Sequence, residues 1–267
     1  MKPKRWCGFR LCAILVLLTL MAGSGRGFAG EADAPSTSMG PAAEEPAEAP
    51  QELSPELKMV LDHLDEANKQ LKDVTARVEY VRAIPLLDEK ERTKGGRLTF
   101  KKPDRVALSL GRPRNEEVYT NGKTWWVVSR NEKQVEVYRS ADQGGANSEA
   151  AFLQVGYGEG SAKLLEKYHV ALLGKSRTGE DGDQPETRYR LKFTPLRKED
   201  ASARYAAIEV ELSDRNWLPR QFVLYERNGE ITHTYTLSKV KTNTDVADKV
   251  FEYTPPGEYA VVDMSEK

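Results

Sequence analysis

The sequence predicts an α+β fold in which one long N-terminal helix precedes an antiparallel sheet of about eleven strands that forms an open barrel. Two observations lead to this prediction. Apolar residues recur at helical spacing from Leu57 to Leu71, and after Asp73 the period changes to two. Short alternating segments then continue almost to the C-terminus, without the regular exchange of strands and helices that is typical of a parallel sheet.

The helix begins at Ser54-Pro55, where serine is a good N-cap and proline fits the first helical position. One apolar stripe follows, so a helix of about five turns has one face to bury. The stripe consists of Leu57, Val60, Leu61, Leu64, Ala67 and Leu71.

The strands begin at residues 74–81, where apolar and polar side chains alternate. Asn121-Gly122 separates two later strands, and both residue types tolerate the positive φ of a type I′ turn, which predicts a tight hairpin. Asn228-Gly229 predicts a second one. The other predicted strands are residues 97–101, 105–110, 117–120, 124–129, 134–139, 187–194, 206–213, 219–227, 230–241 and 250–253.

Two polar segments interrupt the strands. Residues 140–160 are small, polar and rich in glycine, and the GxGxG pattern of residues 156–160 predicts a flexible loop rather than a dinucleotide-binding motif. A short amphipathic helix over residues 162–172, ending at Gly174, follows this loop. Residues 177–186 form a second polar loop.

Residues 1–30 have the features of a secretory signal peptide. Basic residues precede the apolar stretch Leu11–Ala22, which is too short for a permanent transmembrane helix. Small side chains predict cleavage near Ala29, and an uncleaved anchor is the alternative. Residues 31–52 are rich in Pro, Ala and Glu and predict a disordered acidic tether. We expect one folded domain over residues 53–267.

The composition excludes several functional classes. Both cysteines, Cys7 and Cys12, precede the predicted cleavage site, so the mature chain has no disulfide, lipidated cysteine or thiolate ligand of its own. Removing residues 1–30, which hold five basic residues and no acidic one, changes the formal net charge from −1 to −6. Without an overall positive field, nucleic acid is not an expected partner. We expect a monomer.

No catalytic constellation is recognisable, and we expect neither enzyme activity nor a cofactor. The Gly-Lys-Thr of residues 122–124 lacks the earlier glycine of a phosphate-binding loop, because Glu117 stands there. Hydrolase chemistry from residues distant in sequence has no positive support. The histidines have no metal-ligand spacing, so no metal site is expected. They are His63, His169 and His233.

Apolar side chains that alternate along the predicted strands are candidates for lining an internal cavity. A filled core is the alternative, but a curved sheet with a helix across it leaves room for an apolar ligand. The strand period alone does not identify the concave face, because an error of one residue in register exchanges the two faces. The candidates are Leu98, Phe100, Val106, Leu108, Leu110, Trp125, Val127, Phe193 and Phe222.

Several stretches of the chain resemble the periplasmic outer-membrane lipoprotein carrier (LolA) family. Residues 96–105, GRLTFKKPDR, resemble the family's glycine-led strand that ends in a basic residue and proline. Residues 119–126, YTNGKTWW, resemble its turn, and residues 134–138, QVEVY, its strand beginning Gln-Val. Residues 251–257, FEYTPPG, resemble its Phe-x-Phe-x-Pro-Pro-x-Gly close. The resemblance covers residues 56–263.

The resemblance implies an incomplete barrel whose short helices line or lid the concave face. It also implies a soluble periplasmic carrier that holds the acyl chains of lipoproteins, or another lipid, in an apolar cavity for transfer towards the outer membrane. Its partners would then include inner-membrane donor and outer-membrane acceptor proteins. One alternative is an interaction protein that senses lipoproteins or envelope stress, as in the sigma-factor regulator RseB, and a filled-core protein without a ligand is another.

Lys102 stands before Pro103, where the resemblance places an arginine that opens and closes the lid. Lysine keeps the charge but lacks the planar guanidinium with its five donors, so Lys102 is a lid-control candidate whose mechanism would differ. It belongs to a basic cluster, for which an ordinary solvated strand edge is the alternative to a shared basic face. The cluster is Lys101, Lys102, Arg105, Arg112 and Arg114.

Overall fold

The structure is a computed structural model that describes residues 51–139, 151–178, 185–196 and 205–264. These residues fall within one compact unit, Ala49–Lys267. The predicted signal peptide, nearly all of the predicted tether and the first half of the predicted glycine-rich loop lie outside the described residues.

In the described residues, twelve strands form one open sheet, which confirms the predicted fold class with one strand more than expected. The sheet runs in the order β12-β6-β5-β4-β3-β2-β1-β11-β10-β9-β8-β7. The strands are β1 (Asp73–Ile84), β2 (Glu89–Lys101), β3 (Arg105–Leu110), β4 (Glu116–Thr120), β5 (Thr124–Ser129), β6 (Gln134–Arg139), β7 (Tyr168–Thr178), β8 (Glu186–Pro195), β9 (Tyr205–Ser213), β10 (Pro219–Glu226), β11 (Thr232–Thr242) and β12 (Ala260–Asp263).

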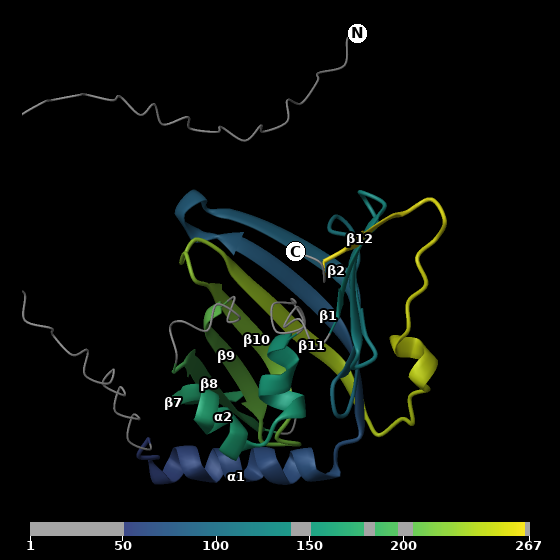
Figure 1. The fold of residues 1–267 in the computed structure, drawn as a ribbon. Coiled ribbons are helices and arrows are strands. Elements are labelled where there is room, and N and C mark those ends of the chain that lie inside the picture. Colours follow the sequence, from purple (N-terminus) through teal and green to yellow (C-terminus); the bar gives the residue numbers. More distant parts are fainter. Residues whose placement is uncertain (1–50, 140–150, 179–184, 197–204, 265–267) are drawn as a thin grey trace, which may run out of the picture. The chain divides into compact units, whose positions relative to one another are not determined.

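Helix α1 (Pro55–Gln70) lies across one end of the curved sheet (Figure 1). It begins as predicted, because the Ser54 hydroxyl accepts a hydrogen bond from the Leu57 backbone N–H at 3.2 Å. The predicted apolar stripe, including Leu61 and Leu64, is buried in the same core as the strands. Burial against the sheet therefore stabilises this helix more than its own sequence propensity does.

The predicted helix over residues 162–172 is wrong in its second half. Helix α2 (Ser161–Lys167) ends at Lys167, and β7 continues through the predicted helical residues. Val170 lies opposite Phe193, so strand β8 supplies both backbone partners and an apolar surface for this segment. Pairing with β8 outweighs a local helical period of only a few residues.

The hairpin at Asn121-Gly122 is confirmed, but its predicted turn type is wrong. Only Gly122 has positive φ, at 90°, whereas a type I′ turn needs two such residues. The Asn121 side-chain oxygen instead accepts hydrogen bonds from the backbone N–H groups of Lys123 and Thr124, both at 3.0 Å. An asparagine side chain thus replaces part of the expected turn geometry.

The predicted strand over residues 250–253 is also wrong. Residues 248–251 form a short 3₁₀-helix, η5 (Asp248–Phe251), and β12 follows and pairs with β6 in parallel. Asp248 forms ion pairs with Lys101 at 2.6 Å and Arg105 at 2.5 Å. These contacts hold the C-terminal segment against β2 and β3, with Phe251 fully buried.

Candidate functional site

The candidate site is the concave face of the sheet, which faces α1. Eight of the nine predicted cavity residues are buried in one core together with the apolar face of α1. The exception is Val127, which lies opposite the buried Val118 but is itself only half-buried. The structure therefore brings the predicted side chains to one face of the sheet. The eight are Leu98, Phe100, Val106, Leu108, Leu110, Trp125, Phe193 and Phe222.

A short helical segment packs against this face. We call residues 151–158 the plug; it consists of η3 (Ala151–Leu153) and the π-helical η4 (Gln154–Gly158). The ring of Phe152 lies 4.8 Å from that of Phe222 and 4.6 Å from that of Tyr235, between ring centroids. The concave face is thus covered by the chain's own aromatic side chains.

The plug also corrects the prediction of a flexible loop. Val155 and Tyr157 are buried, and Tyr157 lies 5.9 Å from Phe100 between ring centroids. The sequence feature that could have indicated a buried segment here is the apolar pair Phe152-Leu153 inside an otherwise polar run. A single turn of 3₁₀-helix followed by a π-helix has neither the period of two nor that of 3.6 residues, so pattern analysis missed it.

Gly156 lets the plug approach strand β10 closely. A Cβ atom at this position would lie 2.4 Å from Cγ of Pro219 and 3.2 Å from the ring of Phe222, so another side chain does not fit without displacement. The adjacent Tyr157 hydroxyl donates a hydrogen bond to the Pro219 carbonyl at 2.8 Å. Burial raises the pKa of Tyr157 well above its usual value, so this hydroxyl remains a neutral donor.

Helix α1 forms hydrogen bonds with the plug and with the start of α2. The Asn68 side-chain amide donates a hydrogen bond to the Gly156 carbonyl at 3.3 Å. The Asp65 carboxylate accepts hydrogen bonds from the backbone N–H of Ser161, at 2.7 Å, and from its hydroxyl, at the first turn of α2. Helix α1, the plug and α2 are therefore joined by polar contacts as well as by apolar packing.

Lys102, the predicted lid-control residue, contacts the same helix position. Its ammonium group donates a hydrogen bond to the backbone carbonyl of Asn68, the residue whose side chain binds the plug. Partial burial lowers the pKa of Lys102 below its usual value. Lys102, Asn68 and Gly156 thus form a continuous polar chain from the β2–β3 turn to the plug.

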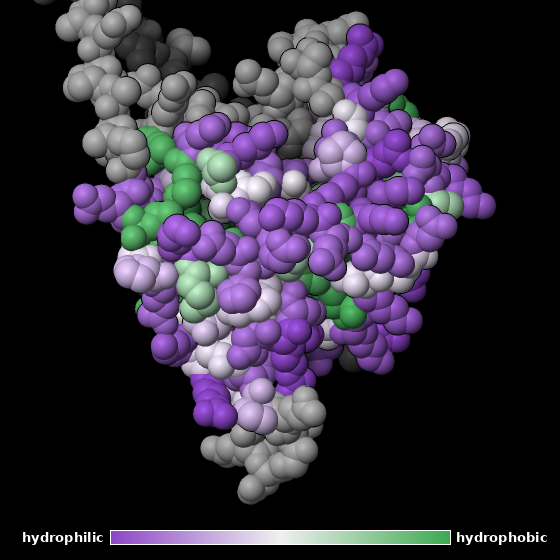
Figure 2. All heavy atoms as spheres, turned by 90° about the horizontal axis from the view of Figure 1, so that it is seen from below, coloured by the Kyte–Doolittle hydropathy of each residue, from purple (hydrophilic) through white to green (hydrophobic). Residues whose placement is uncertain are grey.

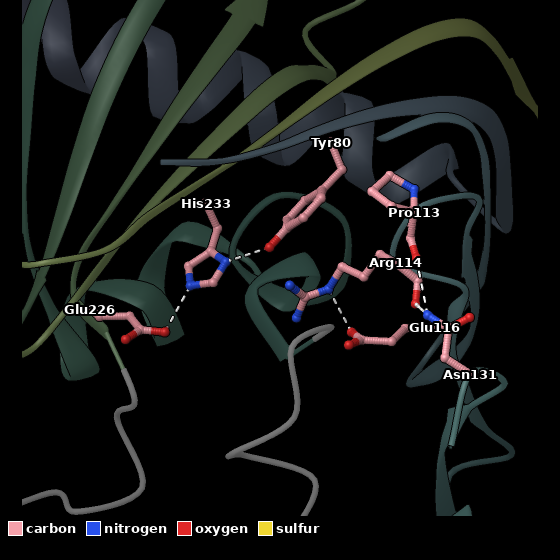
Figure 3. A network of polar contacts seen from close by, with 7 residues as sticks. All are labelled: Tyr80, Pro113, Arg114, Glu116, Asn131, Glu226 and His233. Carbon is pink, nitrogen blue, oxygen red and sulfur yellow. Dashed lines mark hydrogen bonds and ion pairs between the residues drawn. The ribbon is translucent and has the colours of Figure 1, made fainter. Parts of the chain in front are cut away.

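The end of the concave face away from α1 is polar, and we call its residues Tyr80, Arg114, Glu116, Glu226 and His233 the polar network (Figure 3). The Tyr80 hydroxyl lies 2.8 Å from Nδ1 of His233, and Nε2 of His233 lies 2.8 Å from the Glu226 carboxylate. Arg114 forms an ion pair with Glu116 at 2.6 Å, and its guanidinium carbon lies 5.1 Å from the centre of the Tyr80 ring. The concave face therefore changes from apolar near α1 to charged and hydrogen-bonded at its other end.

The three histidines are in separate surroundings. His63 on α1 stacks on Trp217 with 4.2 Å between ring centroids, His169 is exposed on β7, and His233 belongs to the polar network. The part of the chain that the structure describes contains no group of three or more His, Cys, Asp or Glu side chains placed to hold a metal ion.

The basic cluster from the sequence does not form one shared face. Lys101 and Arg105 pair with Asp248, Lys102 contacts Asn68, and Arg114 lies in the polar network. Arg112 is exposed in the turn between β3 and β4. The surface on the α1 side is mostly hydrophilic, with small separate apolar patches (Figure 2).

The chain resembles several solved structures at low sequence identity. An uncharacterised conserved protein from Thermus thermophilus has 12% identity and a TM-score of 0.47, over 77% of this chain and 98% of the other. A putative outer membrane lipoprotein-sorting protein domain from Vibrio parahaemolyticus has 14% identity and a TM-score of 0.41, over 73% and 95%. A chain of the Pseudomonas aeruginosa MucA/MucB complex has 18% identity and a TM-score of 0.37, over 73% of this chain and 60% of the other.

No curated protein matches the sequence. None of the helices in the described ranges has the length and apolar character needed to cross a bilayer. The family described as outer membrane lipoprotein carrier protein LolA matches residues 85–254, which run from the β1–β2 turn to the segment after η5. The predicted resemblance is thereby confirmed over more than half of the sequence, and the chain belongs to the LolA family.

Proposed function

We propose that this protein is a periplasmic carrier that covers the acyl chains of a lipoprotein, or of another lipid, during transfer towards the outer membrane. It acts by binding and release, without a chemical step. The observation that carries the proposal is the plug, because the segment that packs on the apolar concave face is a short helical one and is not a strand of the sheet.

In this proposal an acyl chain replaces the plug on the concave face. Burying one methylene group is worth about 0.8 kcal/mol, so an uncovered long acyl chain is very unfavourable in water. The plug buries Phe152, Leu153, Val155 and Tyr157 on the same surface. Because lipid and plug compete for this surface, the free carrier does not expose it, and the net binding energy stays small enough for release.

The polar network sets the expected orientation of the ligand. Acyl chains fit the apolar part of the concave face near α1, and the polar end with Tyr80, His233 and Glu226 lies at the other end of the same strands. An amphiphile bound with its chains towards α1 would have its polar head near this network. Such an arrangement avoids placing a head group on the apolar surface.

The test is titration of the purified protein with a fluorescent long-chain fatty acid and with a triacylated peptide. The Gly156→Ala variant places a methyl group against Pro219 and so destabilises the plugged state. A larger fraction of open protein raises the apparent affinity, here by about tenfold. Gly257→Ala is the matched control, because a Cβ atom there meets nothing within 4 Å.

Circular dichroism and a thermal melt verify that both variants are folded. Uptake by the wild-type protein, with tighter binding by Gly156→Ala alone, supports the carrier function. Failure of the folded wild-type protein and both variants to take up either probe contradicts it. The same concave face would then be a filled core, and an interaction protein that senses lipoproteins or envelope stress through its outer surface would become the better proposal.

A further inference from the structure

The β1–β2 hairpin extends beyond the strands beside it (Figure 1). β2 begins at Glu89, but its pairing with β3 begins only at Arg97, so the first part of β2 is paired on one side only. On the other side, β1 is paired with β11 as far as Ala83. We call residues 84–88, beyond this last pair, the hairpin tip.

Two large apolar side chains are exposed at the tip. Leu86 is 81% exposed and Leu87 is 64% exposed, which are the highest values among the large hydrophobic residues of the described ranges. Leucine side chains exposed to this degree at adjacent positions lose favourable burial free energy unless another surface covers them.

The turn itself keeps the leucines outside. Residues 85–87 form a 3₁₀ turn, η1 (Pro85–Leu87), which is closed by a hydrogen bond from the Asp88 N–H to the Pro85 carbonyl at 3.2 Å. Asp88 adopts the left-handed conformation, with φ of 52°. Because the turn satisfies its own backbone bond and proline restricts its conformation, the tip does not need a partner to be ordered.

The charges below the tip are mixed. Arg82 lies opposite Glu91, Lys90 follows Glu89 on the other strand, and Arg92 forms an ion pair with Glu79. Residues 79–92, which include Asp88 of the tip, contain three basic and four acidic side chains, so the hairpin has no excess of basic charge. This arrangement is complementary to a layer of zwitterionic head groups and lacks the basic excess that favours strongly anionic surfaces.

We propose that the hairpin tip is a membrane contact, which inserts Leu86 and Leu87 into the interface of a zwitterionic phospholipid bilayer. A projecting pair of side chains needs a pocket in a protein partner, but a bilayer accepts it without one. The apolar tip and the zwitterionic flanks together match the layered polarity of a bilayer surface better than that of a protein groove.

Because of the position of the tip, this contact would also orient the protein on the membrane, which is a role separate from lipid binding. His233 of the polar network lies opposite Arg82, close to the tip, whereas α1 lies at the far end of the same strands. Contact through the tip would present the polar end of the concave face to the membrane. The contact does not require the concave face to be occupied, so it can succeed or fail independently of the carrier function.

The test is sedimentation of the purified protein with phosphatidylcholine vesicles. The double variant Leu86→Ser/Leu87→Ser removes both apolar side chains without adding charge. The control is Leu173→Ser, which removes an exposed leucine, 44% accessible, on β7. We expect the wild-type protein and the control to bind equally at low and high salt, and the double variant to bind about tenfold more weakly.

A second measurement uses Leu87→Trp, whose added fluorescence should be quenched by phospholipids brominated on the acyl chain. Equal vesicle binding by the folded double variant, or no quenching of the added tryptophan, overturns the proposal. Binding only to anionic vesicles that disappears in high salt also overturns it. Loss of self-association instead of vesicle binding in the double variant would identify a second copy of the chain as the occupant. Uptake of acyl probes by the same variants is measured separately and tests the carrier function.

Discussion

Asp73, a buried carboxylate at the start of β1, accepts hydrogen bonds from the segment that follows β11. The donors are the backbone N–H and hydroxyl of Thr244, at 2.8 and 2.9 Å, and the backbone N–H groups of Asp245 and Val246. Burial alone would raise the pKa of Asp73, but the bonds from Thr244, Val246 and Asp245 lower it below its usual value. One side chain therefore fixes the start of the C-terminal segment.

We expect Asp73→Asn to lower the free energy of unfolding at neutral pH by about 1–3 kcal/mol, because an amide is a weaker acceptor than a carboxylate. The folded-state pKa is depressed, so this stabilisation is fully present above the usual value of 3.8 and is lost as the pH falls through the folded-state value. Urea unfolding at several pH values measures the difference. Asp62→Asn, at an exposed position on α1, is the control, and equal stability of the two variants at neutral pH would contradict the prediction.

Most candidate site residues could be predicted because strand alternation is a property of neighbouring residues. Leu98, Phe100, Val106 and Leu108 alternate with polar or small side chains, and they occupy one face in the structure. The alternation does not show which segment of the chain covers that face. Phe152 reaches it from a segment without periodicity, so its position depends on tertiary packing alone.

At the scale of elements, Lys102 connects the β2–β3 turn to the last part of α1. Its ammonium group donates a second hydrogen bond to the Asn68 carbonyl, which also accepts one from the Leu71 backbone N–H at 3.1 Å at the end of the helix. The Asn68 side chain in turn donates to Gly156 in the plug. A substitution at Lys102 should therefore alter the stability of the plug, because both contact Asn68 at the end of α1.

We expect Lys102→Met to lower the free energy of unfolding by about 1 kcal/mol, because it removes the donor but keeps an unbranched apolar stem. Lys102→Arg retains a charged donor and should recover at least half of the loss. Denaturant unfolding measures stability, and hydrogen exchange reports whether amides at the end of α1 and in the plug become less protected. Identical stability and exchange in all three proteins would show that the bond has no structural effect.

Element boundaries differ from the sequence prediction where long-range pairing decides the structure. Val170 and Leu172 fit both a helix and a strand, and β8 decides between them by supplying partners. β12 pairs in parallel with β6, a strand more than a hundred residues earlier in the chain, and a four-residue segment has too few alternations to identify. By contrast, β3, β5 and β6 have the predicted bounds, because each lies between clear turn residues.

At the scale of the whole molecule, the proposed carrier function depends on the sheet being open. In the described residues its edges are β7 and β12, which do not pair with each other. A closed barrel can widen only by breaking ladder hydrogen bonds, whereas an open sheet can flatten while its strand pairs remain intact. In the proposed carrier function, the plug therefore leaves the concave face with a change in the curvature of the sheet, while the strand pairs remain intact.

This mechanism predicts a distinct pattern of hydrogen exchange when an acyl ligand binds. In the free protein, amides of β1, β10 and β11 in the middle of the sheet should exchange most slowly, and those of the plug faster, since its short 3₁₀ and π turns unfold locally at low cost. Addition of a triacylated peptide should slow exchange in the central strands and accelerate it in residues 151–158, because the ligand takes the place of the plug. Mass spectrometry of the peptides from both states measures the two changes. If the ligand instead slows exchange in the plug to the same extent as in the central strands, the plug is a part of the binding surface and is not displaced from it.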